Sequence, residues 1–289
     1  MLIAIHLTGQ VNNLDGILMP GAKLEKLADG FVFTEGPTAD KNENVYFTDQ
    51  PNDRIMMWNT KFGLSVFMEP AGRSNGLALD EKENIWSCAD EKNELWRISP
   101  DKKVEVIAGG FNEKLFNGPN DLWISPLGGV YFTDPFYSRA WWSHSEMPQE
   151  KQRVYFLKPD NKTVIVVAED LQQPNGIAGT PDGKTLYVAD IRGAKTWSYT
   201  INPDGSLGNR ILFCEMGSDG MTIDSKGNLY LTGKGVTVFD KTGKKLGNIP
   251  VPENWTSNVC FGGKNRKILF ITASKGFYQI RLKVRGTSG

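Results

Sequence analysis

The chain has no excess of charge of either sign, and this excludes the proteins that bind polyanions through a cationic surface. Thirty-three Lys and Arg residues balance thirty-three Asp and Glu residues, so the formal net charge at pH 7 is zero. Without an overall positive field, phosphate backbones and anionic lipid head groups are not drawn to the surface. We therefore expect neither nucleic acid nor a membrane among the partners.

Long hydrophobic runs are missing as well. The apolar opening, residues 1–7, is interrupted by His6 and is far shorter than the roughly 20 residues that a helix needs to cross a bilayer. It also lacks the basic leader and the small-residue cleavage site of a signal peptide. We expect a cytoplasmic protein, with a periplasmic or secreted location left open.

Cysteine and histidine are too scarce for a sulfur- or imidazole-based metal site. The three cysteines, Cys88, Cys214 and Cys260, are widely spaced, and His6 and His144 are the only histidines. No C-x-x-C pair is present, which argues against a zinc site of that kind. Each cysteine is predicted to be a small buried residue in a strand.

Helical periodicity is also absent, and an internal repeat takes its place. No ten-residue segment repeats apolar residues at i, i+3 and i+4, and 31 Gly and 15 Pro interrupt the chain. Six copies of one unit, an apolar strand, a polar turn and an aromatic-rich strand, follow one another. They lie at residues 36–49, 76–90, 121–134, 176–190, 220–233 and 258–273.

The repeat predicts a six-bladed β-propeller, an all-β fold. The turns inside the units carry Asn, Asp and Gly, which tolerate the backbone of a tight hairpin. Further alternating segments follow most hairpins, so each unit has about four strands. Radial packing of six such sheets around a channel buries their faces and protects their edges.

The two ends of the chain are predicted to meet in the last blade. Only one strand pattern, residues 277–282, follows the sixth hairpin, and residues 24–27 can supply the missing strand. We expect a single domain over residues 20–283, with an N-terminal extension at 1–19 and a tail at 284–289. The end of that tail, residues 286–289, is expected to be unstructured.

A polar residue precedes each copy at nearly constant phase. The distance from this residue to the aliphatic residue that opens the second strand is 10 or 11 positions in all six copies. The six residues are Glu35, Asn75, Asn120, Asn175, Asp219 and Ser257. Because the first strand of a blade lines the axis, they should form a ring that faces the channel. Asn-Gly and Asp-Gly are also ordinary turn dipeptides, but Glu35 is a poor turn residue.

A ring of carboxylates and amides in a narrow channel indicates a cation. Two facing carboxylates repel each other unless a proton or a cation lies between them. Hard oxygen ligands favour Ca²⁺, with Mg²⁺, Mn²⁺ or Zn²⁺ as alternatives. Open coordination positions would suit catalysis better than a purely structural role.

At these residues the chain resembles the senescence marker protein/gluconolactonase/luciferin-regenerating family of six-bladed propellers. The motifs are F-T-E-G-P at 33–37, N-G-P-N-D at 117–121, P-N-G-I-A at 174–178, S-D-G-M at 218–221 and N-V-C-F-G-G at 258–263. The resemblance implies that Glu35, Asn120, Asn175 and Asp219 hold one divalent cation. It also implies hydrolysis of lactones, with sugar lactones as the usual substrates. Gly118 stands where animal gluconolactonases have an arginine that contacts sugar hydroxyls, so their specificity does not carry over.

We predict roles for several side chains. Asp219 would be the general base, because a carboxylate bound to a dication stays ionised at neutral pH. Asn75, Asn120, Asp134, Trp142 and His144 are predicted to contact substrate or a bound water. A long insertion between the second and third strands of blade three carries Asp134 and five aromatic or imidazole side chains, which are Phe136, Tyr137, Trp141, Trp142 and His144. They could form the wall of the channel mouth, or the tryptophans could merely cover a neighbouring loop.

Four aspartates end the second strands in similar phase. They are Asp49, Asp90, Asp134 and Asp190, and we expect them to cap turns, with Asp134 and Asp190 as alternative substrate contacts. Three functions remain in competition: a metal-dependent lactonase, an organophosphate hydrolase of the diisopropylfluorophosphatase type, and a non-catalytic ligand-binding propeller. The expected partner is a small lactone, and the expected assembly a monomer or weak homodimer.

Overall fold

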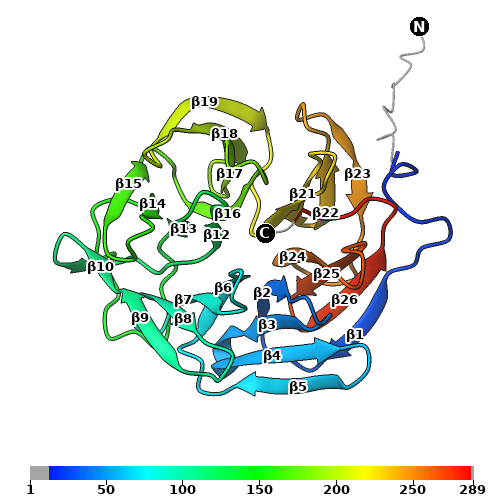
Figure 1. Ribbon diagram of the computed structural model, residues 1–289, viewed down its shortest axis with the longest axis horizontal. Coiled ribbons are helices and arrows are strands. Elements are labelled where there is room, and N and C mark those ends of the chain that lie inside the picture. The colour runs from blue at the N-terminus through cyan, green and yellow to red at the C-terminus, as the bar shows by residue number, and fades with distance from the viewer. Residues whose placement is uncertain (1–12, 288–289) are drawn as a thin grey trace, which may run out of the picture.

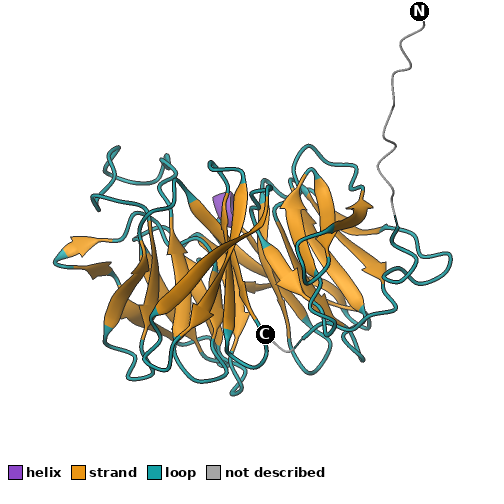
Figure 2. Cartoon of the chain, turned by 90° about the horizontal axis from the view of Figure 1, so that it is seen from above, coloured by secondary structure: helices purple, strands orange, loops and turns teal. Residues whose placement is uncertain are grey.

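Each sequence repeat folds into a four-stranded antiparallel sheet, and the six sheets are arranged as blades around a common axis (Figure 1). The structure is a computed structural model that describes residues 13–287. The prediction of an all-β, six-bladed propeller is therefore confirmed. Seen from the side, the blades form a flat disc with loops on its two faces (Figure 2).

The strands of the first three blades are β2 (Thr34–Ala39), β3 (Val45–Asp49), β4 (Arg54–Asn59) and β5 (Gly63–Met68); β6 (Ser74–Leu79), β7 (Ile85–Ala89), β8 (Glu94–Ile98) and β9 (Val104–Ala108); and β12 (Leu122–Ile124), β13 (Val130–Asp134), β14 (Arg153–Leu157) and β15 (Val164–Ala168). Those of the next two are β16 (Pro174–Gly179), β17 (Thr185–Asp190), β18 (Lys195–Ile201) and β19 (Leu207–Cys214), then β20 (Met221–Ile223), β21 (Leu229–Gly233), β22 (Gly235–Phe239) and β23 (Lys245–Ile249). The sixth blade consists of β24 (Asn258–Gly262), β25 (Ile268–Ala273), β26 (Gly276–Arg281) and β1 (Glu25–Asp29).

Two short elements lie outside this scheme. A small hairpin, β10 (Gly110–Phe111) and β11 (Lys114–Leu115), projects between blades two and three. Within residues 13–287 the only helical segment is the 3₁₀ turn η1 (Gln50–Asn52). The predicted near-absence of helix is confirmed, and none of the helical structure in this range has the length and apolar character needed to cross a membrane.

Aspartate side chains shape the turns between first and second strands. Asp40 Oδ1 accepts the backbone N–H groups of Asn42 and Asn44, both at 2.8 Å. In the next blade, Asp80 Oδ1 accepts the backbone N–H groups of Lys82 and Asn84 in the same way, both at 2.9 Å. These bonds replace ladder bonds where the chain reverses, so the tight hairpins of blades one and two have a local cause.

The hydrophobic core is divided into clusters that lie between neighbouring blades. Each of the six clusters in the described part of the chain draws side chains from two adjacent blades. Between blades three and four, for example, Trp123, Tyr131 and Phe156 pack with Ile177 and Leu186. Removal of this apolar surface from water holds each blade against the next.

The cysteines divide in a way that the sequence did not predict. Cys88 and Cys214 are buried, as expected, but Cys260 is only half-buried. The difference arises because Cys260 lies on the innermost strand of blade six and lines a cavity on the axis.

The ring is closed by segments from opposite ends of the chain, as predicted. Strand β1 pairs antiparallel with β26, with Glu25 opposite Gln279 and Asp29 opposite Gly276. Upstream, Leu14 and Ile17 are each 4% exposed and pack in the cluster between blades five and six. The domain limits of 20 and 283 stay a prediction, and the structure adds that both flanking segments pack on the domain.

The tail is better ordered than expected. Val284 is buried, the N–H of Gly286 donates to Arg266 O at 2.8 Å, and the N–H of Thr287 donates to Ile223 O at 3.3 Å. The expectation of an unstructured end is therefore wrong for residues 286 and 287, because their backbone pairs with blades five and six. Residues 1–12 and 288–289 lie outside the described part of the chain.

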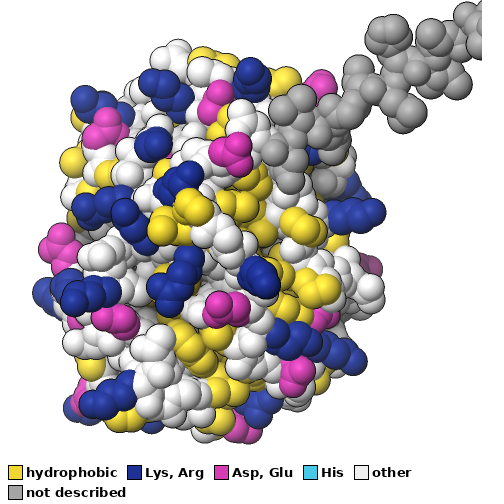
Figure 3. Space-filling view, turned by 90° about the vertical axis from the view of Figure 1, so that its right-hand side faces the viewer, with side chains coloured by type: hydrophobic (Ala, Val, Ile, Leu, Met, Phe, Trp, Pro, Cys, Tyr) yellow, Lys and Arg dark blue, Asp and Glu magenta, His cyan; other side chains and the backbone are white. Residues whose placement is uncertain are grey.

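The outer flank of the propeller carries charges of both signs. Lys and Arg side chains are interspersed with Asp and Glu side chains, with apolar side chains between them (Figure 3). Charged side chains on outer strands hinder pairing of their edges with other chains.

Candidate active site

The six predicted ring positions are structurally equivalent and lie around the axis, where the first strands of the blades begin (Figure 1). In blades three and six, for example, the N–H groups of Asn120 and Ser257 donate to Thr133 O and Thr272 O at 2.9 and 3.0 Å. All six residues are at most 9% exposed. The constant sequence phase thus corresponds to one place in the fold.

Asp219 is held by donors on both of its carboxylate oxygens. Asn175 Nδ2 donates to Asp219 Oδ1 at 2.8 Å, and Trp255 Nε1 donates to Asp219 Oδ2 at 2.6 Å. Asn175 Nδ2 also donates to the hydroxyl of Tyr137 at 2.9 Å. Two ring members are therefore joined directly, and two aromatic side chains fix them from the mouth of the channel.

Glu35 lies close enough to Asp219 for their charges to interact. Its carboxylate is 3% exposed and accepts the N–H of Gly36 at 2.9 Å. Burial raises the pKa of Glu35 well above its ordinary value, and the charges of Asp219 and then Asp121 raise it further. Burial also raises the pKa of Asp219 to about 6. Ionised together, these carboxylates are destabilised unless a cation compensates them.

The other ring residues differ from one another in their hydrogen bonds. Asn75 Oδ1 is buried without a hydrogen-bond partner in the described residues. Asn120 is 6% exposed, and its backbone carbonyl oxygen accepts the N–H of Gly76 at 2.8 Å. The hydroxyl of Ser257, by contrast, donates to Thr34 O at 2.6 Å and lies 3.0 Å from Thr272 O. The Ser257 hydroxyl is thus bonded to the backbone of adjoining strands, and its place in the ring that faces the channel stays a prediction.

A second polar layer, which the ring pattern did not reveal, lies one residue further along the first strands. Four blades have glycine there, whereas blades three and six have Asp121 and Asn258. Asn258 Nδ2 donates to Asp121 Oδ2 across the channel at 3.3 Å. Burial raises the pKa of Asp121 to about 7. The sequence does contain a signal for this layer: blade three has an Asn-Asp dipeptide where blades two, four and five have Asn-Gly or Asp-Gly.

Glycine in the other blades makes room for this second layer. A Cβ atom on Gly220 would lie 2.0 Å from the Asn258 side chain, and one on Gly76 would lie 2.7 Å from Asp121 Oδ1. Next to the layer is a cavity of about 110 Å³ lined by the first strands and by Arg266 and Thr287.

Asp134, one of the predicted substrate contacts, has a different local environment. It is fully buried, and its two oxygens accept the N–H groups of Asn117 at 3.0 Å and Gly118 at 2.8 Å. Burial raises the pKa of Asp134 to about 7. Asp49 and Asp190 accept two backbone N–H groups in the same manner. The capping role expected of these three aspartates is what their bonds provide.

Trp142 and His144 lie together in the insertion. Trp142 Nε1 donates to the carbonyl oxygen of Asp90 at 2.6 Å, and the imidazole of His144 stacks on the indole at a centroid distance of 4.9 Å. His144 Nδ1 lies 3.1 Å from Glu146 O. Within residues 13–287, neither side chain is hydrogen-bonded to a ring residue, whereas the hydroxyl of Tyr137 in the same insertion accepts a bond from Asn175.

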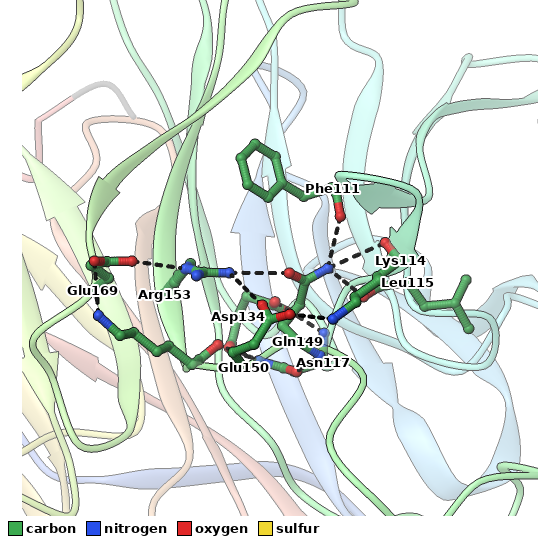
Figure 4. A network of polar contacts seen from close by, with 10 residues as sticks. Phe111, Lys114, Leu115, Asn117, Asp134, Gln149, Glu150, Arg153 and Glu169 are labelled. Atoms are coloured by element: carbon green, nitrogen blue, oxygen red, sulfur yellow. Dashed lines mark hydrogen bonds and ion pairs between the residues drawn. The ribbon is translucent and has the colours of Figure 1, made fainter.

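A polar network anchors the base of the insertion (Figure 4). Gln149 Nε2 donates to three carbonyl oxygens of the β10–β11 hairpin, those of Phe111, Lys114 and Leu115, at 2.8–3.2 Å. Gln149 N donates to Asn117 Oδ1 at 2.9 Å, and Arg153 connects Gln149 Oε1 to Glu169. The loop that reaches the channel mouth therefore begins from a fixed base.

The donor set fits a hard cation only if amides contribute. Within residues 13–287, no three His, Cys, Asp or Glu side chains group closely enough to hold a metal ion. The carboxylates of Glu35 and Asp219 would therefore act with Asn120 and Asn175. Asn175 Oδ1 is buried and has no hydrogen-bond partner in this range, as expected of an oxygen that awaits a ligand.

The fold and this channel site define the class of the protein. Residues 33–275 match the family described as the SMP-30/Gluconolactonase/LRE-like region, and the chain belongs to that family. Among its relatives is the gluconolactonase of Zymomonas mobilis, which is 32% identical over 94% of this chain and 85% of its own length.

Solved structures agree with this assignment. A gluconolactonase from Xanthomonas campestris has a TM-score of 0.84 and 28% identity, covering 90% of this chain and 89% of its own. A calcium-binding regucalcin from Agrobacterium tumefaciens has a TM-score of 0.76 and covers 91% of this chain and 94% of its own. At 18% identity, the similarity to this regucalcin shows only a shared fold.

Trp255 is another site residue, besides Asp121 and Asn258, that the sequence analysis did not identify. It lies two positions before Ser257, in a connection without a repeated motif, and it is 38% exposed. Only the fold brings its indole N–H to Asp219, so no spacing rule could have found it.

Proposed function

We propose that the protein hydrolyses lactones, sugar lactones above all, at a divalent cation held by Glu35, Asn120, Asn175 and Asp219. The observation that carries the proposal is the set of buried carboxylates around the axis beside the unpartnered Asn175 Oδ1. The Zymomonas and Xanthomonas relatives, both named as gluconolactonases, support the choice of substrate. Ca²⁺ suits these oxygen donors best.

A bound cation would supply Lewis-acid polarisation of the lactone carbonyl and stabilise the charge that develops on its oxygen. The chain would supply the proton transfers. With a pKa of about 6, Asp219 is mostly ionised at neutral pH. We assign the base to its Oδ2, to which Trp255 donates, because Oδ1 is bonded to the proposed ligand Asn175.

Hydrolysis would then take place in two steps. Asp219 takes a proton from water as the water oxygen bonds to the carbonyl carbon. The ring C–O bond breaks, and the departing oxygen receives that proton, which gives the hydroxy acid. Asn75 Oδ1, buried without a partner, is proposed to contact substrate or a bound water. Asn120, Trp142 and His144 keep their proposed places as substrate contacts, whereas Asp134 would act through the loop that it holds.

The test compares wild type with Asp219→Asn. After treatment with chelator, hydrolysis of D-glucono-1,5-lactone should be lost and should return with Ca²⁺, Mg²⁺, Mn²⁺ or Zn²⁺. Removal of a general base should lower kcat by roughly 10²- to 10⁴-fold, while circular dichroism and thermal melting show an intact fold. Asp101→Asn, on the surface with 58% of its side chain exposed, is the matched control. Undiminished turnover by Asp219→Asn would remove the residue from the base role, and hydrolysis of an organophosphate alone would favour the rival activity.

A further inference from the structure

Asp90 departs from the pattern of the aspartates that end second strands. In blades one, three and four this aspartate caps two backbone N–H groups of the segment that leads into its own blade. In blade two, the corresponding N–H of Arg73 donates to Asp53 Oδ1 instead, at 2.6 Å. The Asp90 carboxylate is 2% exposed and is left to bind side chains.

The side chain that Asp90 holds most closely is Arg139 from the insertion. Arg139 Nε donates to Asp90 Oδ2 at 2.8 Å, and Gln50 Nε2 donates to the same oxygen at 3.0 Å. Within residues 13–287 no hydrogen bond engages the two terminal nitrogens of Arg139. A buried carboxylate thus fixes one edge of the guanidinium and leaves its fork available.

Arg139 lies next to the proposed active site. Its guanidinium is 5.6 Å from the ring centre of Tyr137, whose hydroxyl accepts the Asn175 bond at 2.9 Å. Asn175 is in turn bonded to Asp219. A short chain of contacts therefore connects the guanidinium to the proposed base.

A second guanidinium, that of Arg73, also packs against the insertion. Trp141 lies within 5.4 Å of Arg139 and 4.6 Å of Arg73, measured from its ring centre. Arg73 forms no ion pair within the described residues, and its Nε is buried without a partner. The carboxylate of Asp53 is occupied by the backbone N–H groups of Ala71 and Arg73. Of the two guanidinium groups, only that of Arg139 is ion-paired with Asp90, whereas one terminal nitrogen of Arg73 donates to Pro51 O at 2.7 Å.

The side chains of Trp142 and Asp90 fill the space next to Gly118. A Cβ atom on Gly118 would lie 2.9 Å from the Trp142 ring and 3.0 Å from Asp90 Oδ1. Position 118 therefore cannot carry a side chain without displacing the residues that hold Arg139. Recognition of substrate at this level falls to the insertion.

We propose that Arg139, positioned by Asp90 and assisted by Arg73, binds an anionic substituent of the substrate. The preferred substrates are then lactones with a phosphate, sulfonate or carboxylate at the end far from the lactone carbonyl. This inference rests on the proposed lactone hydrolysis. A guanidinium fork matches the paired oxygens of such groups, and the apolar faces of Tyr137 and Trp141 limit its competition with water.

The experiment measures kcat and KM for D-glucono-1,5-lactone and for its 6-phosphorylated, 6-sulfonated and 6-carboxylated counterparts. Wild type should prefer the anionic lactones. Arg139→Gln should lose roughly 10- to 100-fold in kcat/KM for them, mainly through KM, because a charged hydrogen bond is lost. The neutral lactone should change less than about threefold. Arg139→Lys should recover part of the loss, and Arg73→Gln should show a smaller loss. Arg281→Gln, on the exposed face of β26, is the control.

The outcomes separate the two proposals. Equal losses on neutral and anionic lactones in Arg139→Gln, or no preference in wild type, would overturn the anion site while lactone hydrolysis stands. If no lactone is hydrolysed, the proposed function fails, and calorimetry with gluconate and 6-phosphogluconate then tests the anion site alone. Tighter binding of 6-phosphogluconate that Arg139→Gln abolishes would support it, and equal binding of the two acids would refute it.

Discussion

At the scale of single residues, aspartate has several roles in this protein, and each role depends on the groups that surround the carboxylate. Asp49, Asp134 and Asp190 hold backbone N–H groups, Asp90 holds a guanidinium, and Asp219 is held by an amide and an indole. The sequence places the four strand-end aspartates in one phase, but it does not show which donors reach them. The donors are supplied by loops that carry no repeat.

Asp90 should give the protein a pH-dependent stability that one substitution removes. Burial raises its pKa to about 6, although Arg139 acts in the opposite direction, whereas aspartate in an unfolded chain titrates near about 3.9. The folded state therefore retains a proton that the unfolded state releases. The free energy of unfolding should fall as pH rises from about 4 to about 6, by up to about 1.4 kcal/mol per pH unit from this group.

Urea unfolding of wild type and Asp90→Asn from pH 4 to 7, with chelator present, measures this effect. The variant should show a shallower slope in that window, equivalent to about one proton. Asp101→Asn serves as the exposed control and should retain the wild-type slope. Parallel curves for wild type and Asp90→Asn would show that folding leaves the pKa of Asp90 unchanged.

At the scale of elements, the strands were predictable and the connections were not. Alternating apolar residues and Asp-containing turns predict paired strands such as β20 and β21, because both signals are local. The β10–β11 hairpin, with two residues in each strand, is too short for any period to show. Trp255 and Arg139 reach their partners only through the fold, and Ser257 has the predicted phase but a hydroxyl that is bonded to the backbone of adjoining strands.

Gln149 should be the residue on which the order of the insertion depends. It is 2% exposed, and its amide serves three carbonyl oxygens of the β10–β11 hairpin. Gln149→Ala leaves these acceptors without that donor, which should lower the free energy of unfolding by about 1–3 kcal/mol. Residues 135–149 should become more sensitive to limited proteolysis, and KM should rise more than kcat falls.

Gln172→Ala is the matched control, because Gln172 is exposed and bonds to Gln152 through its backbone carbonyl. It should match wild type in urea unfolding and proteolysis. Wild-type protection of the insertion in Gln149→Ala would show that the aromatic contacts alone hold the loop.

At the scale of the whole molecule, the segments before and after the repeats contribute to the closed ring. Ile17 is 4% exposed and packs with residues of blades five and six. Ile17→Ala should lower the free energy of unfolding by about 2–5 kcal/mol, because it leaves a cavity between those elements. Thermal melting provides the measurement.

Met19→Ala is the comparison, since Met19 lies two positions away and is 43% exposed. Its melting temperature should stay close to that of wild type. Equal effects of the two substitutions would mean that the upstream segment merely covers the propeller.

The pairing of β1 with β26 has a consequence for biosynthesis. Gln279 Nε2 donates to Glu25 Oε2, and these partners are separated by 254 positions in the chain. At a ribosomal rate of about 5–20 residues per second, roughly 13–50 s pass between the synthesis of the two partners. During that interval the nascent chain carries a strand with nothing to pair with, so five blades can assemble while the sixth waits for the last-made hairpin.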